Sequence, residues 1–514
     1  MKKTLIIGIV AVMLSGCKED FLNLTPPTSL SSATYFQNEE QFRQAINGAY
    51  TPMRELTDVG VYDDEMRSDN TFFTIYQANR GLDKAREAYP QFLIDATASA
   101  IPNTPGSRWR ASYRGIAYVN TIIDRLATNN AVSAEAKNAI LGEALFLRAY
   151  YYFSLVTHFG GVPLLLKEVT NPEESFQPRN TAAEVYAQIK TDVKSAIDLL
   201  PVASTFPQSG RATKGAAKML LAYALMSGDT RDYAAAEKEL LDITKMNYAL
   251  LPDYAKVFDP TNKNHQESIF DVQYMADRVS GQQSAFAWQF MPKVTNPQFL
   301  MGFDGGRMNI FSGWNVPTDE MVASYEKGDL RLPASIAVVE GTISGVEDFT
   351  AELLTSPVNY TPKAGKAFRY MIRKYFHPPY DIAFNTPDNF PVYRYSGALL
   401  LLAECLVQQN KAAAALPYLN QVRRRAGLPD LGAATLDAVS KEMRHELAFE
   451  NRRWQDLIRI GKAIEVATAK GNRLKAQYGW ILPAAFNVTP QKLLDPIPFR
   501  ETQINTQLEQ NPGY

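Results

Sequence analysis

The sequence predicts a mainly α-helical fold, in which tetratricopeptide-like helix pairs form a scaffold for an irregular, loop-rich lobe that carries short strands. Apolar residues recur at three- and four-residue spacings over long stretches, the period of a helix with one buried face. Two stretches of about 30 to 34 residues each show a helix, a tight turn and a second helix. Residues 255–395 lack that period and are dense in Pro, Gly, Asn and aromatic residues. We therefore expect helical regions at 36–254 and 396–514, separated by an irregular insertion at 255–395.

The first residues predict an exported protein with a lipid anchor. Lys2 and Lys3 precede an apolar stretch, residues 4–14, that is far shorter than the roughly 20 residues needed to span a bilayer. Leu14-Ser15-Gly16-Cys17 then resembles a bacterial lipobox, which makes residues 1–16 a lipoprotein signal peptide and Cys17 the lipidated first residue of the mature chain. A plain secretory signal with an incidental cysteine is the alternative. Several acyl chains on one residue would anchor the protein stably.

Residues 17–35 are predicted to be an extended, lipidated tether, because they are rich in Pro, Ser and Thr and have no helical period. The charged run Lys18-Glu19-Asp20 resembles the surface-export signal of Bacteroidetes lipoproteins, and a solvated linker is the alternative. No later stretch approaches about 18 continuous apolar residues, so the lipid is the only predicted membrane contact. The predicted location is the outer membrane, with the protein exposed at the cell surface.

Two long helices are predicted within residues 108–158. In the second, Ile140, Ala144, Leu147, Tyr151 and Leu155 fall on one face. The Gly pair that follows at 160–161 is expected to end this helix, because glycine is a poor helix former and a frequent helix terminator.

The two helix–turn–helix stretches lie at 213–246 and 396–425. Gly228-Asp229 forms the predicted turn of the first, and residues 408–411 form that of the second. Small residues along the facing stripes would let the paired helices approach closely. Generic helical hairpins are the alternative to tetratricopeptide-like units.

The charge balance argues against a nucleic-acid-binding protein. The chain has 53 basic and 54 acidic residues, so no strong basic field is available to attract phosphates. The densest basic run, Arg423–Arg425, closes a predicted helix, where cations complement the negative end of the helix dipole and are expected to face solvent. Cys405 lies in an apolar run and is expected to be a small core residue.

No catalytic or metal-binding motif is recognised. Gly-rich phosphate loops and a Gly-x-Ser-x-Gly elbow are absent from the sequence. His445-Glu446 is followed by Phe449 where a zinc protease needs a second histidine. We predict no cofactor and no metal, although the run Asp63-Asp64-Glu65 would allow calcium without requiring it. The many acidic residues leave a glycosidase with paired carboxylates open, but no pair stands out.

The segment Arg444–Arg459 (RHELAFENRRWQDLIR) combines an apolar face with regularly spaced charges. Its charged residues Glu446, Glu450, Arg453 and Asp456 lie three or four positions apart, which supports ion pairs along a helix. We expect a buried or half-buried ion-pair lattice that locks two helices together, rather than a catalytic cluster.

Several segments, in order along the chain, resemble the SusD/RagB family of outer-membrane nutrient-binding lipoproteins. They accompany the lipobox and are Ser68-Asp69-Asn70, Leu145–Leu165, Ala403-Glu404, Leu419–Arg423, Arg425–Pro429, Glu446–Arg459, Asp495–Pro498 and Gln510–Tyr514. The resemblance implies a helical fold with an irregular ligand-binding lobe and no catalysis. It also implies a partner, a TonB-dependent outer-membrane barrel of the SusC type, through which captured oligosaccharides or polysaccharides are imported. Peptide ligands are the alternative, and a surface glycosidase is the less favoured one.

Sugar capture requires flat apolar faces and a few polar groups, and aromatic rings supply contact area at low entropic cost. In the family the ligand surface generally comes from two regions, which correspond here to residues 69–92 and 274–315. The candidate ligand-binding residues are Phe73, Tyr76, Arg80, Tyr274, Trp288, Trp314 and Asn315. Trp288 and Trp314 are the preferred stacking platforms because polar residues and glycines surround them, with packing inside the protein as the alternative. Neither the sugar nor its linkage is specified by the sequence.

Overall fold

The computed structural model describes residues 35–74, 83–97, 104–276, 281–303, 312–345 and 348–514. The signal peptide, the tether and Cys17 lie outside these residues, as do two predicted ligand-binding residues, Tyr76 and Arg80.

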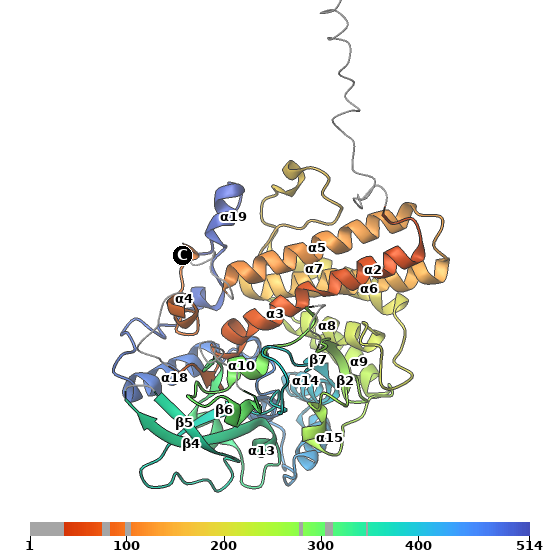
Figure 1. The fold of residues 1–514 in the computed structure, drawn as a ribbon. Helices are drawn as coiled ribbons and strands as arrows, with labels where there is room; N and C mark the ends of the chain where they lie inside the picture. The colour runs from red at the N-terminus through yellow and green to blue at the C-terminus, as the bar shows by residue number, and fades with distance from the viewer. Residues whose placement is uncertain (1–34, 75–82, 98–103, 277–280, 304–311, 346–347) are drawn as a thin grey trace, which may run out of the picture.

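The N-terminal half is a layer of long, roughly parallel or antiparallel helices, seen at the top of the molecule in Figure 1. The elements are α2 (Glu39–Tyr50), α3 (Pro52–Gly60), the π-helical turn η2 (Val61–Glu65), the short α4 (Asp83–Ala88), α5 (Pro105–Thr128), α6 (Ala134–Phe159), η4 (Pro172–Ser175) and α7 (Ala182–Leu199). The two helices predicted within 108–158 are α5 and α6, and α6 ends where Gly160 adopts a positive φ of 70°.

Helix α6 lies at the centre of this layer and packs against α5 and α7. Among the described residues it is the helix that is long and apolar enough to cross a membrane, yet 72% of its apolar window is buried inside the molecule. Its apolar surface is therefore used for packing in the core.

Helices α5 and α6 cross at Gly115. A Cβ atom at Gly115 would lie 2.2 Å from the Cε2 atom of Tyr151 on α6. The Tyr151 hydroxyl donates a hydrogen bond of 2.6 Å to the carbonyl of Ala49, which fixes the ring in place. The close approach of the two helices thus depends on a residue without a side chain.

The two predicted helix pairs are confirmed. They are α8 (Lys214–Met226) with α9 (Tyr233–Thr244), and α14 (Tyr395–Gln408) with α15 (Ala412–Arg425). Helix α14 packs against α9 as well as α15, so the two pairs stack although about 150 residues separate them. Cys405 on α14 is fully buried, as predicted, and its Sγ donates to the Tyr233 carbonyl at 3.0 Å.

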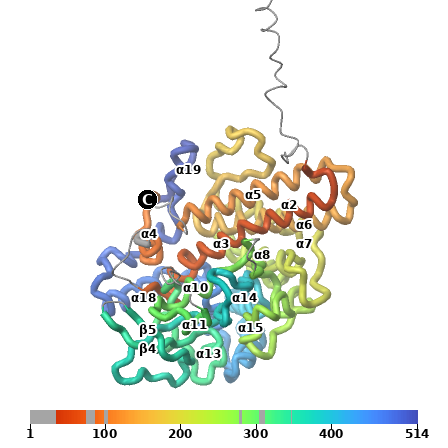
Figure 2. The backbone as a smooth tube through the Cα atoms, viewed as in Figure 1, coloured from red at the N-terminus to blue at the C-terminus, as the bar shows by residue number. Residues whose placement is uncertain are grey.

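The chain between the two helix pairs folds into short strands and small helices, as predicted, on the lower side of the molecule (Figures 1 and 2). Its elements are η5 (Tyr254–Val257), β2 (Ser268–Val272), α10 (Phe286–Phe290), α11 (Gln298–Met301), β3 (Val316–Pro317), α12 (Asp319–Ser324), α13 (Arg331–Ser335), β4 (Ile336–Ser344), β5 (Asp348–Thr355), β6 (Ala367–Ile372) and β7 (Phe390–Arg394). The order β5-β4-β6 forms an antiparallel sheet, and β2 pairs with β7. One face of the three-stranded sheet covers a second, smaller apolar core that includes Trp288.

The C-terminal region contacts both the N-terminal helices and the irregular lobe. It contains α16 (Leu436–Glu446), α17 (Arg453–Arg459), α18 (Ala463–Gln477), η7 (Pro490–Leu493) and α19 (Phe499–Ile504). The expectation that Glu446, Glu450, Arg453 and Asp456 lie along one helix is wrong. Helix α16 ends at Glu446, and Phe449 and Asn451 adopt positive φ values of 67° and 53° before α17 begins. The Glu65 carboxylate accepts the backbone N–H groups of these two residues at 3.0 and 3.1 Å, so hydrogen bonds from outside replace those of a helix.

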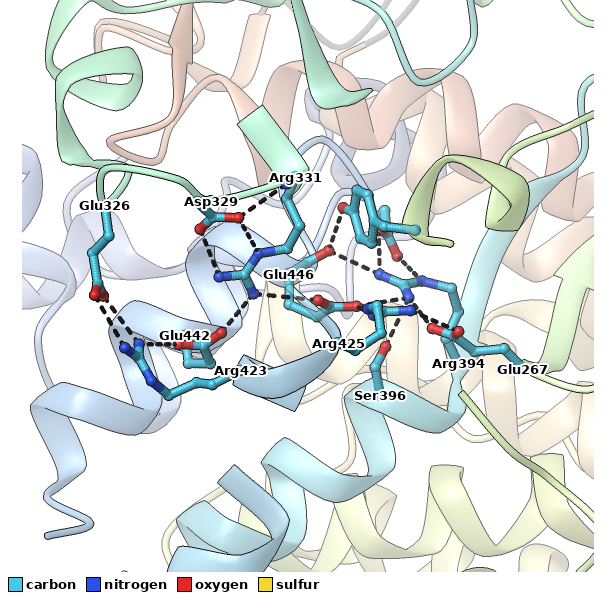
Figure 3. A network of polar contacts seen from close by, with 12 residues as sticks. Glu267, Glu326, Asp329, Arg331, Arg394, Ser396, Arg423, Arg425, Glu442 and Glu446 are labelled. Carbon is cyan, nitrogen blue, oxygen red and sulfur yellow. Dashed lines mark hydrogen bonds and ion pairs between the residues drawn. The ribbon is translucent and has the colours of Figure 1, made fainter. Parts of the chain in front are cut away.

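The predicted ion-pair lattice is confirmed, but its partners come from several segments and not from one helix (Figure 3). Glu446 accepts from Arg331 at 3.3 Å, from Arg394 at 3.0 Å and from Arg425. These arginines come from α13, from the end of β7 and from α15. The lattice therefore connects the irregular lobe to helices α15 and α16.

The expectation that Arg423–Arg425 face solvent holds only for Arg424, which pairs with Asp430 at the surface. The Arg423 side chain is 3% exposed and the Arg425 side chain 4% exposed, and both join the lattice. The helix dipole does not decide the exposure of these two arginines, because the acids that bind them lie outside α15.

Candidate ligand-binding site

The short β1–β3 ladder brings together the two sequence regions that were expected to form the ligand site. Strand β1 (Thr71–Phe72) pairs antiparallel with β3 (Val316–Pro317), with Thr71 opposite Pro317 and Phe72 opposite Val316. The Thr71 hydroxyl donates to the Asn315 side-chain oxygen at 2.6 Å, and the Thr74 amide donates to the Gly313 carbonyl at 2.8 Å. The region after residue 69 and the region before residue 316 therefore meet, as predicted.

Next to this ladder lies a group of rings that we call the aromatic cluster. Its members, from four parts of the chain, are Phe72, Phe73, Trp314, Tyr478, Trp480 and Phe486. Phe72 stacks on Phe73 with ring centroids 4.2 Å apart, and Phe72 lies nearly parallel to Trp480 at 6.3 Å. Ring pairs at such distances contribute stabilisation beyond their buried area.

Exposure divides the aromatic cluster into an inner and an outer part. Phe72 and Phe73 are each 5% exposed and Trp314 is 7% exposed, whereas Tyr478 is 37% and Trp480 is 38% exposed. The Tyr478 and Trp480 ring centroids are 5.6 Å apart with the planes at 32°. The outer pair presents ring surface to solvent, and the inner rings hold it in position.

Polar groups surround the outer pair. Burial raises the pKa of Tyr478, and the charges of Asp319 and Arg369 also act on it, in opposite directions. Gln477 donates to the Asp319 carboxylate at 3.4 Å. A sugar lying on these rings would find hydrogen-bonding groups at their edge.

Lys470 on α18 connects the outer pair to the ladder. Its Nζ atom is buried and donates to three backbone carbonyls, those of Met66 at 2.5 Å, Ser68 at 2.6 Å and Thr71 at 2.8 Å. The same ammonium lies over the Phe72 ring, 5.3 Å from its centroid. Burial lowers the pKa of Lys470 to about 7, and the nearby charge of Asp69 opposes that change.

The turn at Ser68-Asp69-Asn70 is fixed by two arginines of the C-terminal region. Arg453 donates to the Asp69 carboxylate at 2.8 Å, and Arg444 donates to the Asn70 side-chain oxygen at 2.9 Å. Although burial opposes it, the two guanidinium charges hold the pKa of Asp69 well below its usual range. The motif around residues 444–453 thus positions the chain that enters β1.

Of the predicted ligand-binding residues, the structure places three at this site. Phe73 and Trp314 belong to the aromatic cluster, with ring centroids 5.8 Å apart. Asn315 is fully buried, has a positive φ of 55° and links β1 to β3. Trp314 also packs against Tyr62, which leaves little of its surface open.

Two other predicted residues lie away from the aromatic cluster. Trp288 is fully buried in the second core, where its ring packs against Tyr380 and Phe384 at 5.0 and 5.4 Å. Tyr274 is 6% exposed and packs against Phe286, with Arg54 over its ring. A stacking platform needs an open ring face, and neither residue offers one in this conformation. The glycines and polar residues around Trp288 did not reveal that the β4–β6 sheet would cover it.

Tyr478 and Trp480 were not among the predicted residues. The available sequence signal was the run Tyr478-Gly479-Trp480 just after an amphipathic helix, two large rings that no helical stripe could bury. Both residues lie outside the two regions, 69–92 and 274–315, from which the ligand site was expected to form.

The acidic run at 63–65 is engaged by side chains of the protein. Ligand atoms of Asp63, Asp64 and His158 lie within 4.8 Å of one another, a spacing that could hold a metal ion. Arg108 donates to both Asp63 oxygens at 2.6 Å and to Asp64 at 2.8 Å, so a guanidinium already supplies positive charge there. Glu65 accepts from Asn70 at 2.7 Å.

Comparison with known proteins gives matches along nearly the whole chain. A profile of the SusD family matches residues 266–514, and a profile described as "Starch-binding associating with outer membrane" matches residues 20–225. A SusD-like protein from Formosa agariphila is 28% identical over 96% of this chain and 96% of its own length. A SusD-like protein from Bacteroides ovatus is 25% identical over 89% of this chain and 82% of its own.

Solved structures share the fold. A laminarin-binding SusD-like protein superposes with a TM-score of 0.72 at 25% identity, covering 93% of this chain and 100% of that one. Surface glycan-binding protein A from Bacteroides thetaiotaomicron, solved with laminarihexaose, has a TM-score of 0.72 at 23% identity, covering 92% and 99% of the two chains.

Stacked helix pairs and an open aromatic surface at the edge of an irregular lobe define the class of protein, a helical scaffold that carries an irregular lobe with exposed rings. Within that class, the two profile matches and the full-length relatives identify the family: the chain belongs to the SusD/RagB family.

Proposed function

We propose that this protein binds an oligosaccharide or polysaccharide at the cell surface without transforming it, and that the outer pair of the aromatic cluster, Tyr478 and Trp480, is the platform on which the sugar lies. The observation that carries this proposal is the exposure of two adjacent rings on a rigid aromatic base. The C–H face of a pyranose packs on such rings, and the surrounding polar groups satisfy its hydroxyls. The laminarin-binding relative supports a glycan as the ligand.

Within this proposal the other expected residues have different parts. Phe73, Trp314 and Asn315 support the platform from behind, and Tyr76 and Arg80 follow directly in sequence from β1. Trp288 and Tyr274 would act on the ligand only if their surroundings opened. The insertion at 255–395 contributes Trp314, whereas the C-terminal region at 396–514 contributes the platform itself.

The proposed setting is that of the family. Lipidation of Cys17 would hold the mature chain on the outer membrane, facing the medium, and a TonB-dependent transporter of the SusC type would receive the sugar for import. The family profile that mentions association with the outer membrane supports this location. Protection of the protein from protease added to intact cells would argue against surface exposure.

Affinity electrophoresis tests the binding proposal directly. The purified protein is run through gels that contain laminarin, starch or other plant, host and microbial polysaccharides, and we expect at least one of them to retard it. Trp480→Ala should weaken binding at least about tenfold, the equivalent of about 1.4 kcal/mol of lost ring contact. The matched control is Leu482→Ala, which removes another exposed apolar side chain from the same loop. It should bind like the wild type.

Three results would contradict the proposal. Equal retardation of wild type and Trp480→Ala would move the platform elsewhere, and Trp288→Ala would then be examined. Absence of retardation by every glycan, together with binding of peptides, would favour a peptide ligand. Shortening of the glycan during incubation with the protein would instead indicate a glycosidase.

A further inference from the structure

A cavity lies among the helices, apart from the aromatic cluster. It has a volume of about 410 Å³, within the range of about 300 to 1,000 Å³ that is typical of small-molecule sites. Its walls come from α6, α7, α8, β7 and residues 450–459, and none of the rings of the aromatic cluster lines it. We call it the interhelical cavity.

Arg452 lines the interhelical cavity and has no carboxylate partner. Arg452 is half-buried and forms no hydrogen bond or ion pair with a described residue, and its Nε atom is buried without a partner. Its one close contact is the Tyr223 ring, whose centroid is 4.0 Å from the Arg452 Cζ atom. Removing part of a charged group from water without a partner is costly, and the Nε atom of Arg452 is in this position.

The fully buried arginines in the described part of the chain give a comparison, since each of them forms an ion pair with an acid. They are Arg67, Arg108, Arg148, Arg331, Arg394, Arg423, Arg444, Arg453 and Arg459. Arg453 and Arg452 are neighbours in sequence, and only Arg453 has its acid, Asp69. The described part of the chain pairs its buried guanidinium groups with acids, whereas the half-buried guanidinium of Arg452 has no acid partner and faces a cavity.

Two of the three acids that line the cavity, Asp64 and Glu450, are already engaged, and the third, Asp229, is exposed to solvent. Asp64 accepts from Arg108 at 2.8 Å and is 3.1 Å from His158. Glu450 accepts from Lys374 at 2.8 Å and from Arg394 at 2.8 and 3.0 Å. Asp456, whose charge acts on Arg452, forms its ion pair with Arg459. Arg452 is therefore a half-buried cation of the cavity wall that has no ion-pair partner among the described residues.

Two neutral groups beside Arg452 also lack hydrogen-bond partners. They are the hydroxyl of Tyr393, a residue that is 2% exposed, and the side-chain oxygen of Asn451. The hydroxyl can donate to an oxygen, and the amide oxygen can only accept, so it needs a hydroxyl or amine from the ligand. The rings of Tyr150, Tyr186 and Tyr223 supply flat apolar walls.

We propose that the interhelical cavity binds a hydroxylated carboxylate of monosaccharide size, such as a free hexuronic acid. Its carboxylate would accept paired hydrogen bonds from the planar fork of Arg452, the geometry that arginine favours with carboxylates. A ring hydroxyl would donate to the Asn451 oxygen, another carboxylate or hydroxyl oxygen would accept from Tyr393, and the apolar face of the sugar would pack on the tyrosines. This site is separate from the glycan platform and does not depend on it.

Thermal unfolding and isothermal titration calorimetry test the site. Glucuronate and galacturonate are the probes, glucose is the neutral analogue of the same size, and sodium chloride controls for ionic strength. We expect a hexuronate to raise the melting temperature of the wild type, and glucose and salt at equal concentration to leave it unchanged. Arg452→Gln should bind the hexuronate at least tenfold more weakly and should melt no lower than the wild type in plain buffer, because it removes an unpaired charge.

Control variants separate this site from other causes. Arg424→Gln removes an exposed arginine that pairs with Asp430, and it should respond to the hexuronate like the wild type. Trp480→Ala should also keep the response, and Arg452→Gln should keep the retardation by polysaccharide, so that each site can fail alone.

Either of two results would overturn the proposal. One is a wild type whose melting temperature responds to neither hexuronate more than to glucose. The other is an Arg452→Gln protein that responds as strongly as the wild type.

Discussion

Lys470 shows how one side chain can organise a binding surface. Its ammonium satisfies three carbonyls of the chain that enters β1, while the helix that carries it leads into Tyr478 and Trp480. Nothing in the sequence distinguished this lysine from the others on α18, because its acceptors are backbone atoms about 400 residues away.

Lys470→Met should destabilise the protein by about 3 kcal/mol or more. The change preserves the length of the side chain but leaves three buried carbonyls without a donor, and each such loss costs about 1 to 3 kcal/mol before relaxation. Urea unfolding followed by circular dichroism measures the effect. Lys475→Met is the matched control, since its amine lies at the surface and donates to a single carbonyl, that of Pro483. A change below about 1 kcal/mol for Lys470→Met would contradict this role.

The same lysine gives the molecule a pH dependence of known sign. Burial lowers the pKa of Lys470 to about 7 in the folded chain, whereas an unfolded lysine titrates near 10.4. Between these values the unfolded chain binds the additional proton, so the stability from this group is complete above the unfolded pKa and is lost as the pH falls towards 7.

We therefore expect the difference in unfolding free energy between wild type and Lys470→Met to grow with pH, by up to about 1.4 kcal/mol per pH unit. Urea unfolding of both proteins at about pH 6 and about pH 9 checks this expectation. Methionine does not titrate, and every other titratable group is the same in the two proteins, so the difference between them isolates the contribution of Lys470. A difference that stays constant or shrinks with rising pH would refute the assignment.

At the scale of the elements, close packing of α5 on α6 makes a glycine more stabilising than alanine. In an open helix, replacing glycine by alanine gains roughly 0.5 to 1 kcal/mol. At Gly115 the new methyl group would overlap the Tyr151 ring, which its own hydrogen bond holds in place.

Gly115→Ala should therefore destabilise the protein by about 1 to 3 kcal/mol, the usual cost of overpacking. Gly48→Ala on α2 is the matched control, because a methyl group there meets nothing within 4 Å, and it should stabilise the protein by about 0.5 to 1 kcal/mol. Thermal melts of the two single variants give opposite signs. The same sign for both would show that the crossing relaxes easily.

Periodicity explains which elements could be predicted. Long helices with one apolar face, such as α6 and the pairs α8–α9 and α14–α15, follow directly from it. The break between α16 and α17 did not, because the three- and four-residue spacing continues through residues 447–452. It is the carboxylate of Glu65, from a distant turn, that captures the amides of Phe449 and Asn451. The spacing of residues within one segment does not show that a distant carboxylate will bind its backbone amides.

At the scale of the whole molecule, the ion-pair lattice of Figure 3 holds the lobe and the C-terminal helices as one body. Glu446 is its centre, since three arginines from three elements donate to it. Their charges hold the pKa of Glu446 well below its usual range although burial opposes this. Removing one partner from such a buried group leaves the others uncompensated.

Glu446→Gln should lower the free energy of unfolding by about 3 to 5 kcal/mol. The exposed pair of Arg424 and Asp430 serves as the control, and Asp430→Asn should change stability by less than about 1 kcal/mol. Chemical denaturation of both variants makes the comparison. Equal effects of the two substitutions would mean that the lattice adds no more than a surface pair.

The candidate site shows what sequence could and could not foresee for the whole molecule. The meeting of the two expected regions at β1 and β3 was predicted, and so were Phe73, Trp314 and Asn315 as members of that place. The exposed platform was not, because exposure is a property of the assembled surface. Trp288 and Trp480 look alike in sequence, each near glycines and polar residues, yet a sheet covers one and solvent meets the other.

The aromatic cluster has a consequence for the life of the protein in the cell. Its rings come from near residue 72, from residue 314 and from residues 478–486, so a ribosome must finish almost the entire polypeptide before the surface can exist. Under the proposed function, no early fragment of the chain could bind the sugar. Retention on an immobilised glycan would then separate complete, folded chains from incomplete ones in a single step.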